Sequence, residues 1–253
     1  MGLEIINAAG NARLVAPSIR LPASLAGARG FFAMGGEVPA SRRNRVPGRL
    51  MQRPTIVGAP DASAPGYCRL RHLTNYFQTD FEDVPFFTLG CIVRAVVPFA
   101  AGSDRPVFFG NTILGGGTPG ISLYFQTYTD TSFSLVGGAS VDVSGTPTTA
   151  NTQILNVPNP LGWKLVIFQI SGTERRMTDV TDNLTTWQAE ARTRVLSAER
   201  HRIGSTAQAN GTVFGQADIC NMIWLPGFAA SESQRADIAG LLRADAALVG
   251  ITA

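Results

Sequence analysis

Short runs of alternating apolar and polar residues, separated by glycine and proline, dominate the chain from about residue 66 onward. In 121–127 the apolar residues point to one side, and Ser122, Tyr124 and Gln126 point to the other. Many short strands without the spacing of β–α–β units predict an all-β sandwich or barrel. The 27 glycines and 15 prolines agree with this and exclude a bundle of long helices.

Several segments share this strand pattern. They are 86–99, 105–111, 121–127, 133–135, 141–143, 164–170, 202–204 and 215–225. Residues 164–170 and 219–225 are largely apolar on both faces, so we expect central strands that are covered on both sides. Cys91 and Cys220 lie in apolar runs and are expected to be small buried side chains. With Cys68 they make an odd, widely spaced set that does not suggest a disulfide framework or a zinc site.

One helix is predicted near the C-terminus, at about 231–247. Ser231 and Gln234 have the spacing of a capping box, and leucine and isoleucine then recur at helical spacing. Residues 190–200 are also predicted to be locally helical.

Residues 1–65 are of a different kind, with seven prolines, eight glycines and little periodicity. An independent core is not expected from such a segment. We predict an extended arm that docks onto its own domain, 66–253, or onto neighbouring subunits. Its basic residues are assigned to assembly contacts, where arginine is favoured: Arg42, Arg43, Arg45, Arg49 and Arg53. Nucleic-acid binding is disfavoured, because interleaved aromatic residues and a known reader motif are missing.

The charge is distributed unevenly. Residues 1–72 hold ten arginines and three acidic residues, and the chain as a whole has a formal net charge of +3. The basic and acidic parts would attract each other within one molecule or between subunits, although an ordinary uneven surface is an equal alternative. Apolar runs are shorter than the roughly 18 residues that span a bilayer, and no secretory signal is evident. We therefore expect synthesis in a cytoplasm and no membrane insertion.

The chain from about residue 66 onward resembles a known family. The segments HRIGS at 201–205 and GQADICNMIWL at 215–225, followed by the helix that begins at Ser231-Glu232, are similar to the closing pattern of laminin-G-like, concanavalin A-like jelly rolls. Earlier strands of the family resemble 75–79, 86–89 and 162–166, so that the resemblance covers about 66–250. It implies an all-β, antiparallel jelly-roll sandwich with a C-terminal helix, of the kind found in tailed-phage virion proteins.

Catalytic chemistry is not indicated. The E-x-D-x-x-E carboxylates of the family's glycoside hydrolases are absent, and 80–83, the nearest approach to an acidic pair, is interpreted as a turn. A Ca²⁺ site at 179–182 is considered and disfavoured. His72 and His201 each lie beside an arginine, without the spacing of metal ligands. We predict no enzyme activity, no cofactor and no metal.

Two functions remain open. The first is a non-catalytic structural protein of a phage or phage-like particle, a capsid decoration, tail or fibre component. It would be located in the virion and would associate with itself and with other virion proteins through the arm. The second is a carbohydrate-binding module. Its glycan-binding residues would be Tyr124, Gln126 and Tyr128 on one strand and Trp187 elsewhere, unless these aromatic rings only cover the sandwich. The two are compatible if a particle protein recognises a host surface glycan.

Overall fold

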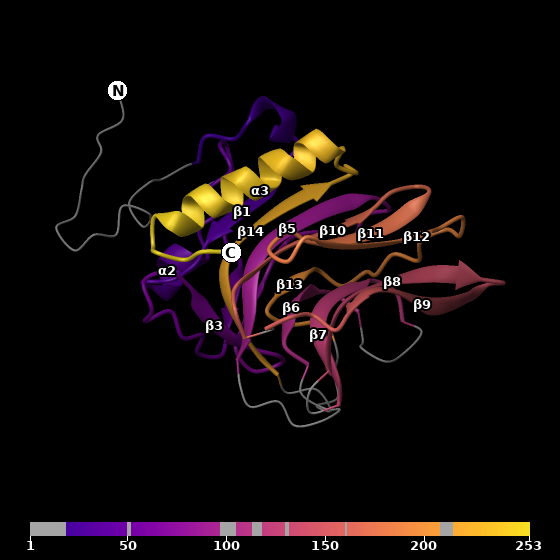
Figure 1. Cartoon of the computed structure of the whole chain (residues 1–253), viewed down its shortest axis with the longest axis horizontal. Helices are drawn as coiled ribbons and strands as arrows, with labels where there is room; N and C mark the ends of the chain where they lie inside the picture. The colour runs from indigo at the N-terminus through magenta and orange to yellow at the C-terminus, as the bar shows by residue number, and fades with distance from the viewer. Residues whose placement is uncertain are drawn as a thin grey trace.

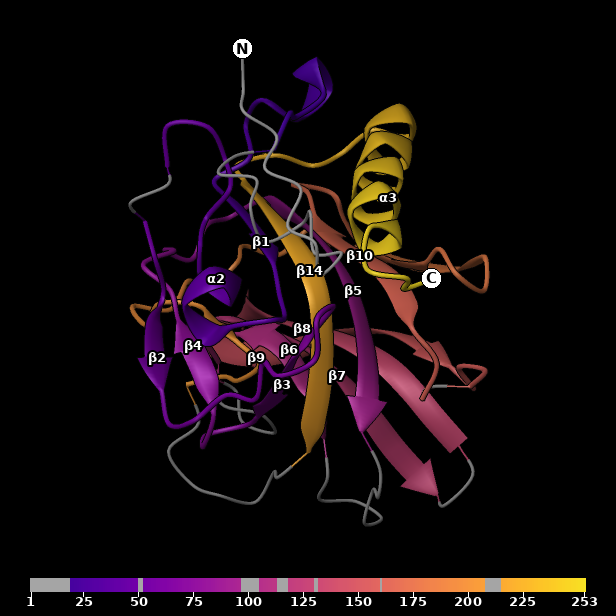
Figure 2. The same cartoon turned by 90° about the vertical axis from the view of Figure 1, so that its left-hand side faces the viewer.

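The fold is a sandwich of two antiparallel sheets with a long helix on the outside of one of them (Figures 1 and 2). The computed structural model describes residues 19–49, 52–96, 105–112, 118–129, 132–159, 161–207 and 215–253, without the side chains of 127–129 and 132. The predicted fold class, an antiparallel jelly-roll sandwich with a C-terminal helix, is confirmed.

The first sheet, sheet A, has the strand order β1-β14-β5-β10-β11-β12, and β3 also pairs with β14. In that order the strands are Gly30–Ala33, Gln216–Pro226, Phe87–Val96, Lys164–Ile170, Glu174–Asp179 and Leu184–Ala189, and β3 is Cys68–Arg71. Sheet B has the order β2-β4-β13-β6-β7-β8-β9. Its strands are Thr55–Val57, Tyr76–Gln78, Arg202–Ile203, Val107–Gly110, Ile121–Thr129, Ser132–Val143 and Thr146–Leu155.

The main core lies between the two sheets and follows from the alternation in the sequence. Leu123 and Phe125 of β7 point into it, while Tyr124 points to the outer face of sheet B. Trp224 of sheet A lies 4.9 Å from Phe87 and 5.2 Å from Phe109 of sheet B, measured between ring centroids. Every residue of β10 is buried, which confirms it as a covered central strand.

A second core lies between sheet A and the helix α3, Glu232–Ala247. The helix crosses the outer face of sheet A above β14, β5 and β10, and β11 and β12 lie beyond it (Figure 1). The predicted capping box is present, because Ser231 and Gln234 exchange backbone-to-side-chain hydrogen bonds. Among the described residues, none of the helices has the length and hydropathy needed to cross a lipid bilayer.

The described part of the predicted arm lies on the sandwich of its own chain. It contains the 3-10 turn η1, Ala23–Leu25, the short helix α2, Val38–Ser41, and two strands. Of these strands, β1 pairs with β14 and β2 pairs with β4. The sheets therefore have no break at residue 65, and any role of this segment in assembly stays a prediction.

Two local expectations differ from the structure. Residues 190–200 are not helical, because their backbone is held by bonds to other segments, such as Asp142 N to Thr193 O at 2.8 Å. The segments 133–135 and 141–143 belong to the single strand β8, and β9 follows it as an unpredicted partner.

Candidate functional site

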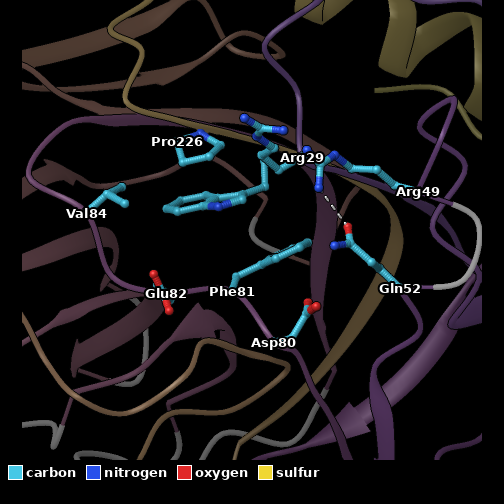
Figure 3. A pocket seen from close by; sticks show the side chains of 9 residues that line it. Arg29, Arg49, Gln52, Asp80, Phe81, Glu82, Val84 and Pro226 are labelled. Carbon is cyan, nitrogen blue, oxygen red and sulfur yellow. Dashed lines mark hydrogen bonds between the residues drawn. The ribbon is translucent and has the colours of Figure 1, made fainter.

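One pocket lies where the segment 79–86 approaches the N-terminal segment, and its volume is about 260 Å³ (Figure 3). It is lined by Arg29, Arg49, Gln52, Asp80, Phe81, Glu82, Val84, Trp224 and Pro226. Figure 3 shows three polar side chains from the N-terminal segment on one side and two carboxylates on the other, with Phe81 between them. Ligand pockets commonly measure about 300–1,000 Å³, so this pocket lies just below the usual range.

Some polar groups of the pocket have hydrogen-bond or ion-pair partners among the described residues, and others do not. Arg49 donates to Gln52 at 3.1 Å, and Glu82 pairs with Arg200 at 2.6 Å. No hydrogen bond to the carboxylate of Asp80, or from the guanidinium of Arg29, comes from the residues that the structure describes. Within the described part of the chain, the pocket therefore offers the Asp80 carboxylate as an acceptor and the Arg29 guanidinium as a donor beside an apolar wall.

A buried ion pair fixes the wall of this pocket to the opposite loop. Arg194 Nη2 donates to both carboxylate oxygens of Asp83 at 2.9 Å, and the backbone N–H of Ser197 donates to Asp83 at 3.0 Å. The side chain of Asp83 is fully buried, and the backbone of 80–83 is irregular without a turn, so the expected solvent-facing acidic turn is wrong. Removing one partner of a buried pair costs about 3–5 kcal/mol, so the pair holds two loops in one position.

His201 lies beside this pair and is fully buried. Burial, and then the charge of Arg194, lower its pKa to about 3. The ring packs on Phe109 at 4.7 Å and on Trp224 at 4.9 Å. Among the described residues, no group of three or more His, Cys, Asp or Glu side chains is arranged to hold a metal ion.

A second surface lies on the outer face of sheet A, beyond α3. Trp187 of β12 is 59% exposed, the highest value among the large hydrophobic side chains of the described residues. It pairs across the strands with Arg176 of β11, which in turn pairs with Gln169 of β10. Gln169 accepts a hydrogen bond from Arg235 of α3 at 3.3 Å. We call this line of residues, Trp187, Arg176, Gln169 and Arg235, the Trp187 face.

Hydrogen bonds within the sheet hold the polar groups of the Trp187 face in place. Arg176 donates two hydrogen bonds to the carboxylate of Glu174, at 3.0 and 3.2 Å. Thr185 and Thr178, which flank this pair, are joined at 3.3 Å. Burial, and then the nearby charge of Arg176, lower the pKa of Arg235. The face thus combines one exposed aromatic ring with planar polar groups in fixed positions.

The structure places the four predicted glycan residues differently. Trp187 is exposed, and it lies on a different sheet from the other three. Tyr124 points outward, but its ring is 5% exposed and packs with Val107 and Val136. Gln126 is half-buried and contacts the Tyr124 hydroxyl at 3.5 Å. The side chain of Tyr128 lies outside the described residues.

The two carboxylates of the segment 179–182 have partners within the protein. Asp179 Oδ1 accepts hydrogen bonds from the backbone N–H groups of Thr181 and Asp182, at 3.0 and 3.3 Å. The Asp182 carboxylate contacts the ammonium group of Lys164. The carboxylates of this segment are thus engaged by groups of the protein, and the structure gives no support to a calcium site here.

The predicted assembly arginines have varied surroundings. Arg45 is buried, Arg42 donates to the Pro54 carbonyl at 3.4 Å, and Arg49 lines the pocket. Arg53 is exposed and Arg43 is half-buried. These residues do not form one continuous basic site.

Comparison with solved structures extends the description of the fold. No protein-family model and no curated protein sequence matches the chain. Crystal structures of two HCR/D point mutants superpose on it with a TM-score of 0.53 at 6% identity, covering 87% of this chain and 53% of theirs. The receptor binding domain of botulinum neurotoxin mosaic serotype C/D follows with a TM-score of 0.49 at 6% identity, covering 87% of this chain and 52% of that one.

The chain therefore spans about half the length of the structures that it resembles. At such low identity the likeness shows the fold alone. It supports the sandwich fold that the resemblance implies, while the relation to lectins and to virion proteins stays a prediction.

Proposed function

We propose that this chain is a non-catalytic carbohydrate-binding domain that binds glycans on the Trp187 face. The observation that carries the proposal is the exposure of Trp187, 59%, next to hydrogen-bonding groups in fixed positions. Burying the ring of a tryptophan is favourable, so this exposed indole is available for contact with a ligand.

The chemistry of the face fits a sugar. The apolar C–H face of a pyranose ring can stack on an indole, while its hydroxyl groups bond to planar amide and guanidinium groups. Arg176 lies opposite Trp187 on the adjacent strand, so guanidinium donors lie beside the ring. Gln169, one strand further on, is buried and holds Arg235 in place. Neutralisation of Arg176 by Glu174 favours a glycan of low charge.

Glycan-array binding by the purified chain and its variants tests this proposal. We expect the wild type to bind at least one glycan class and Trp187→Ala to lose at least tenfold in affinity. Trp187→Phe, which keeps an aromatic ring, should retain part of the binding. Leu155→Ala is the matched control, because Leu155 is 56% exposed but belongs to sheet B.

Two outcomes would contradict the assignment. If no glycan binds, carbohydrate binding is wrong. If a glycan binds equally well to Trp187→Ala but not to Asp80→Asn, the site is the pocket of Figure 3 and not the Trp187 face.

We further propose a phage or phage-like particle as the setting of this domain. The support is the N-terminal segment, in which the side chains of Arg43 and Arg53 have no partner within the described part of the chain. Free guanidinium groups of this kind suit contacts with neighbouring subunits. Solution mass and electron microscopy test the idea: a strictly monomeric chain that is absent from purified particles would contradict it.

A further inference from the structure

The chain contains a single lysine, and the fold buries it. Lys164 begins β10, and its side chain is 3% exposed. Its register partner on β5 is Val93, a residue of the core between the sheets. The Nζ atom contacts Oδ2 of Asp182, in the turn between β11 and β12. An amine and a carboxyl from separate elements therefore meet at the end of the core.

A second carboxyl lies next to this pair. Asp179 ends β11, is fully buried, and uses Oδ1 to accept two backbone hydrogen bonds. Its Oδ2 atom is also buried and has no hydrogen-bond partner among the described residues. Burial, and then the charge of Asp182, raise the pKa of Asp179 to about 6, although Lys164 acts in the opposite direction. The group can thus hold and release a proton near neutral pH.

Keeping Lys164 and Asp182 as a charged pair costs free energy. An ammonium group has three donors, and the described residues offer Lys164 one acceptor group, Asp182. Burying both charges carries a desolvation penalty that a single contact does not fully offset. A neutral amide between the same two side chains would remove both charges and keep one N–H donor.

We propose that Lys164 and Asp182 are joined by an intramolecular isopeptide bond, with Asp179 relaying the proton. Nζ of Lys164 attacks Cγ of Asp182, so that an N–C bond forms and one C–O bond breaks. The oxygen leaves as water with two of the three ammonium protons, and the third stays on the amide. The reaction needs no oxidant and no second reactant, and it is helped because the fold holds the reacting groups in contact.

Such a bond would tie the start of β10 to the β11–β12 turn. That hairpin carries Trp187 and Arg176 of the Trp187 face at the edge of sheet A. The cross-link would therefore protect an exposed edge against local opening. The proposal is independent of glycan binding, because it concerns only the covalent state of the chain.

Intact mass and digestion of the denatured wild-type chain test the proposal directly. The mass should be lower than that of the sequence by one water molecule. A lysine-specific endoproteinase should leave the chain uncut, because its one target side chain is blocked. A chain with the full sequence mass that is cut after residue 164 would overturn the proposal, whether or not any variant folds.

Variants then assign the roles. Lys164→Arg and Asp182→Ala should have their full sequence masses, and a lost water in Lys164→Arg would overturn the assignment to this pair. Asp182→Asn should still cross-link, with loss of ammonia, and give the same product as the wild type. Asp179→Asn should cross-link at least tenfold more slowly than the wild type when both chains are folded for the first time from inclusion bodies, and wild-type speed would overturn its role as the proton relay.

Discussion

His201 is an imidazole that the fold keeps neutral. It is fully buried, and its pKa is about 3 against 6.5 for an ordinary histidine. Neither ring nitrogen has a hydrogen-bond partner in the described part of the chain, and Nε2 is 3.9 Å from Asp83 Oδ1. Stacking on Phe109 and Trp224 therefore decides its position.

This burial predicts a specific acid sensitivity. Between pH 6.5 and about 3 the unfolded chain takes up a proton at His201 that the folded chain does not bind. The histidine therefore makes the free energy of unfolding fall as pH falls through this window, by at most about 1.4 kcal/mol per pH unit. Above pH 6.5 it contributes no slope.

His201→Phe isolates this contribution, because a phenyl ring keeps the stacking and does not titrate. Asp179, whose pKa is raised from 3.8 to about 6, contributes a slope of opposite sign between those values in both proteins. We expect urea-unfolding measurements at a series of pH values to show that, as the pH falls below 6.5, the free energy of unfolding of the variant rises relative to that of the wild type. Parallel curves for the two proteins would contradict a neutral, buried His201.

Single residues also show what the sequence can and cannot reveal. Trp187 follows polar residues on a strand-like run, and the sequence leaves open whether its ring covers the sandwich or is exposed, as the structure has it. The pairing of Asp83 with Arg194 joins positions 111 residues apart, so no local pattern announces it. Tyr124 lies on the predicted face, yet its low exposure depends on the packing around the outer sheet.

At the scale of elements, Gly90 determines how closely α3 lies on sheet A. A Cβ atom at Gly90 would lie 2.6 Å from Cγ2 of Ile238 and 3.1 Å from Cδ1 of Leu242. We expect Gly90→Ala to push the helix outward and to lower the free energy of unfolding by about 1–3 kcal/mol, as overpacking does.

Gly240 is the matched control within the same helix, because a Cβ atom there meets nothing within 4 Å. Gly240→Ala should raise stability by up to about 1 kcal/mol through helix propensity. Urea unfolding of both variants measures the contrast. A Gly90→Ala protein as stable as the wild type would show that the helix is not seated on this glycine.

Strands and helices were predictable from the sequence where apolar residues recur at a regular spacing. The strand 164–170 coincides with β10, and the helix predicted at 231–247 begins one residue before α3, at its cap. By contrast, β9 contains four threonines and a proline, and buries only Ala150, Thr152 and Ile154. Its partner β8, and not its own hydrophobicity, makes it a strand. The segment 190–200 has a composition that favours a helix. Its backbone is nevertheless not helical, because the buried ion pair of Arg194 and the backbone hydrogen bonds to β8 hold it in place.

At the scale of the whole molecule, the N-terminal segment is part of both cores. Phe31 packs in the core beneath α3, and Phe32 packs in the core between the sheets. Pairing of β1 with β14 also covers a strand edge, since Gly30 lies opposite Trp224. A sequence poor in periodicity gave little sign of this, because four residues suffice for β1.

We therefore predict that residues 66–253 alone do not form a stable sandwich. Deleting residues 1–65 removes β1 and β2 and uncovers one edge of β14. It also leaves cavities where Phe31 and Phe32 were. The thermal unfolding of the shortened chain, followed by near-ultraviolet circular dichroism, should lack the cooperative transition of the full chain.

Phe32→Ala in the full chain should lower the free energy of unfolding by about 3–5 kcal/mol. Arg53→Ala, at an exposed position of the same segment, should leave it within about 0.5 kcal/mol of the wild type. If the shortened chain melts as sharply and at the same temperature as the full chain, the N-terminal segment is a separate arm and not a structural part of the sandwich.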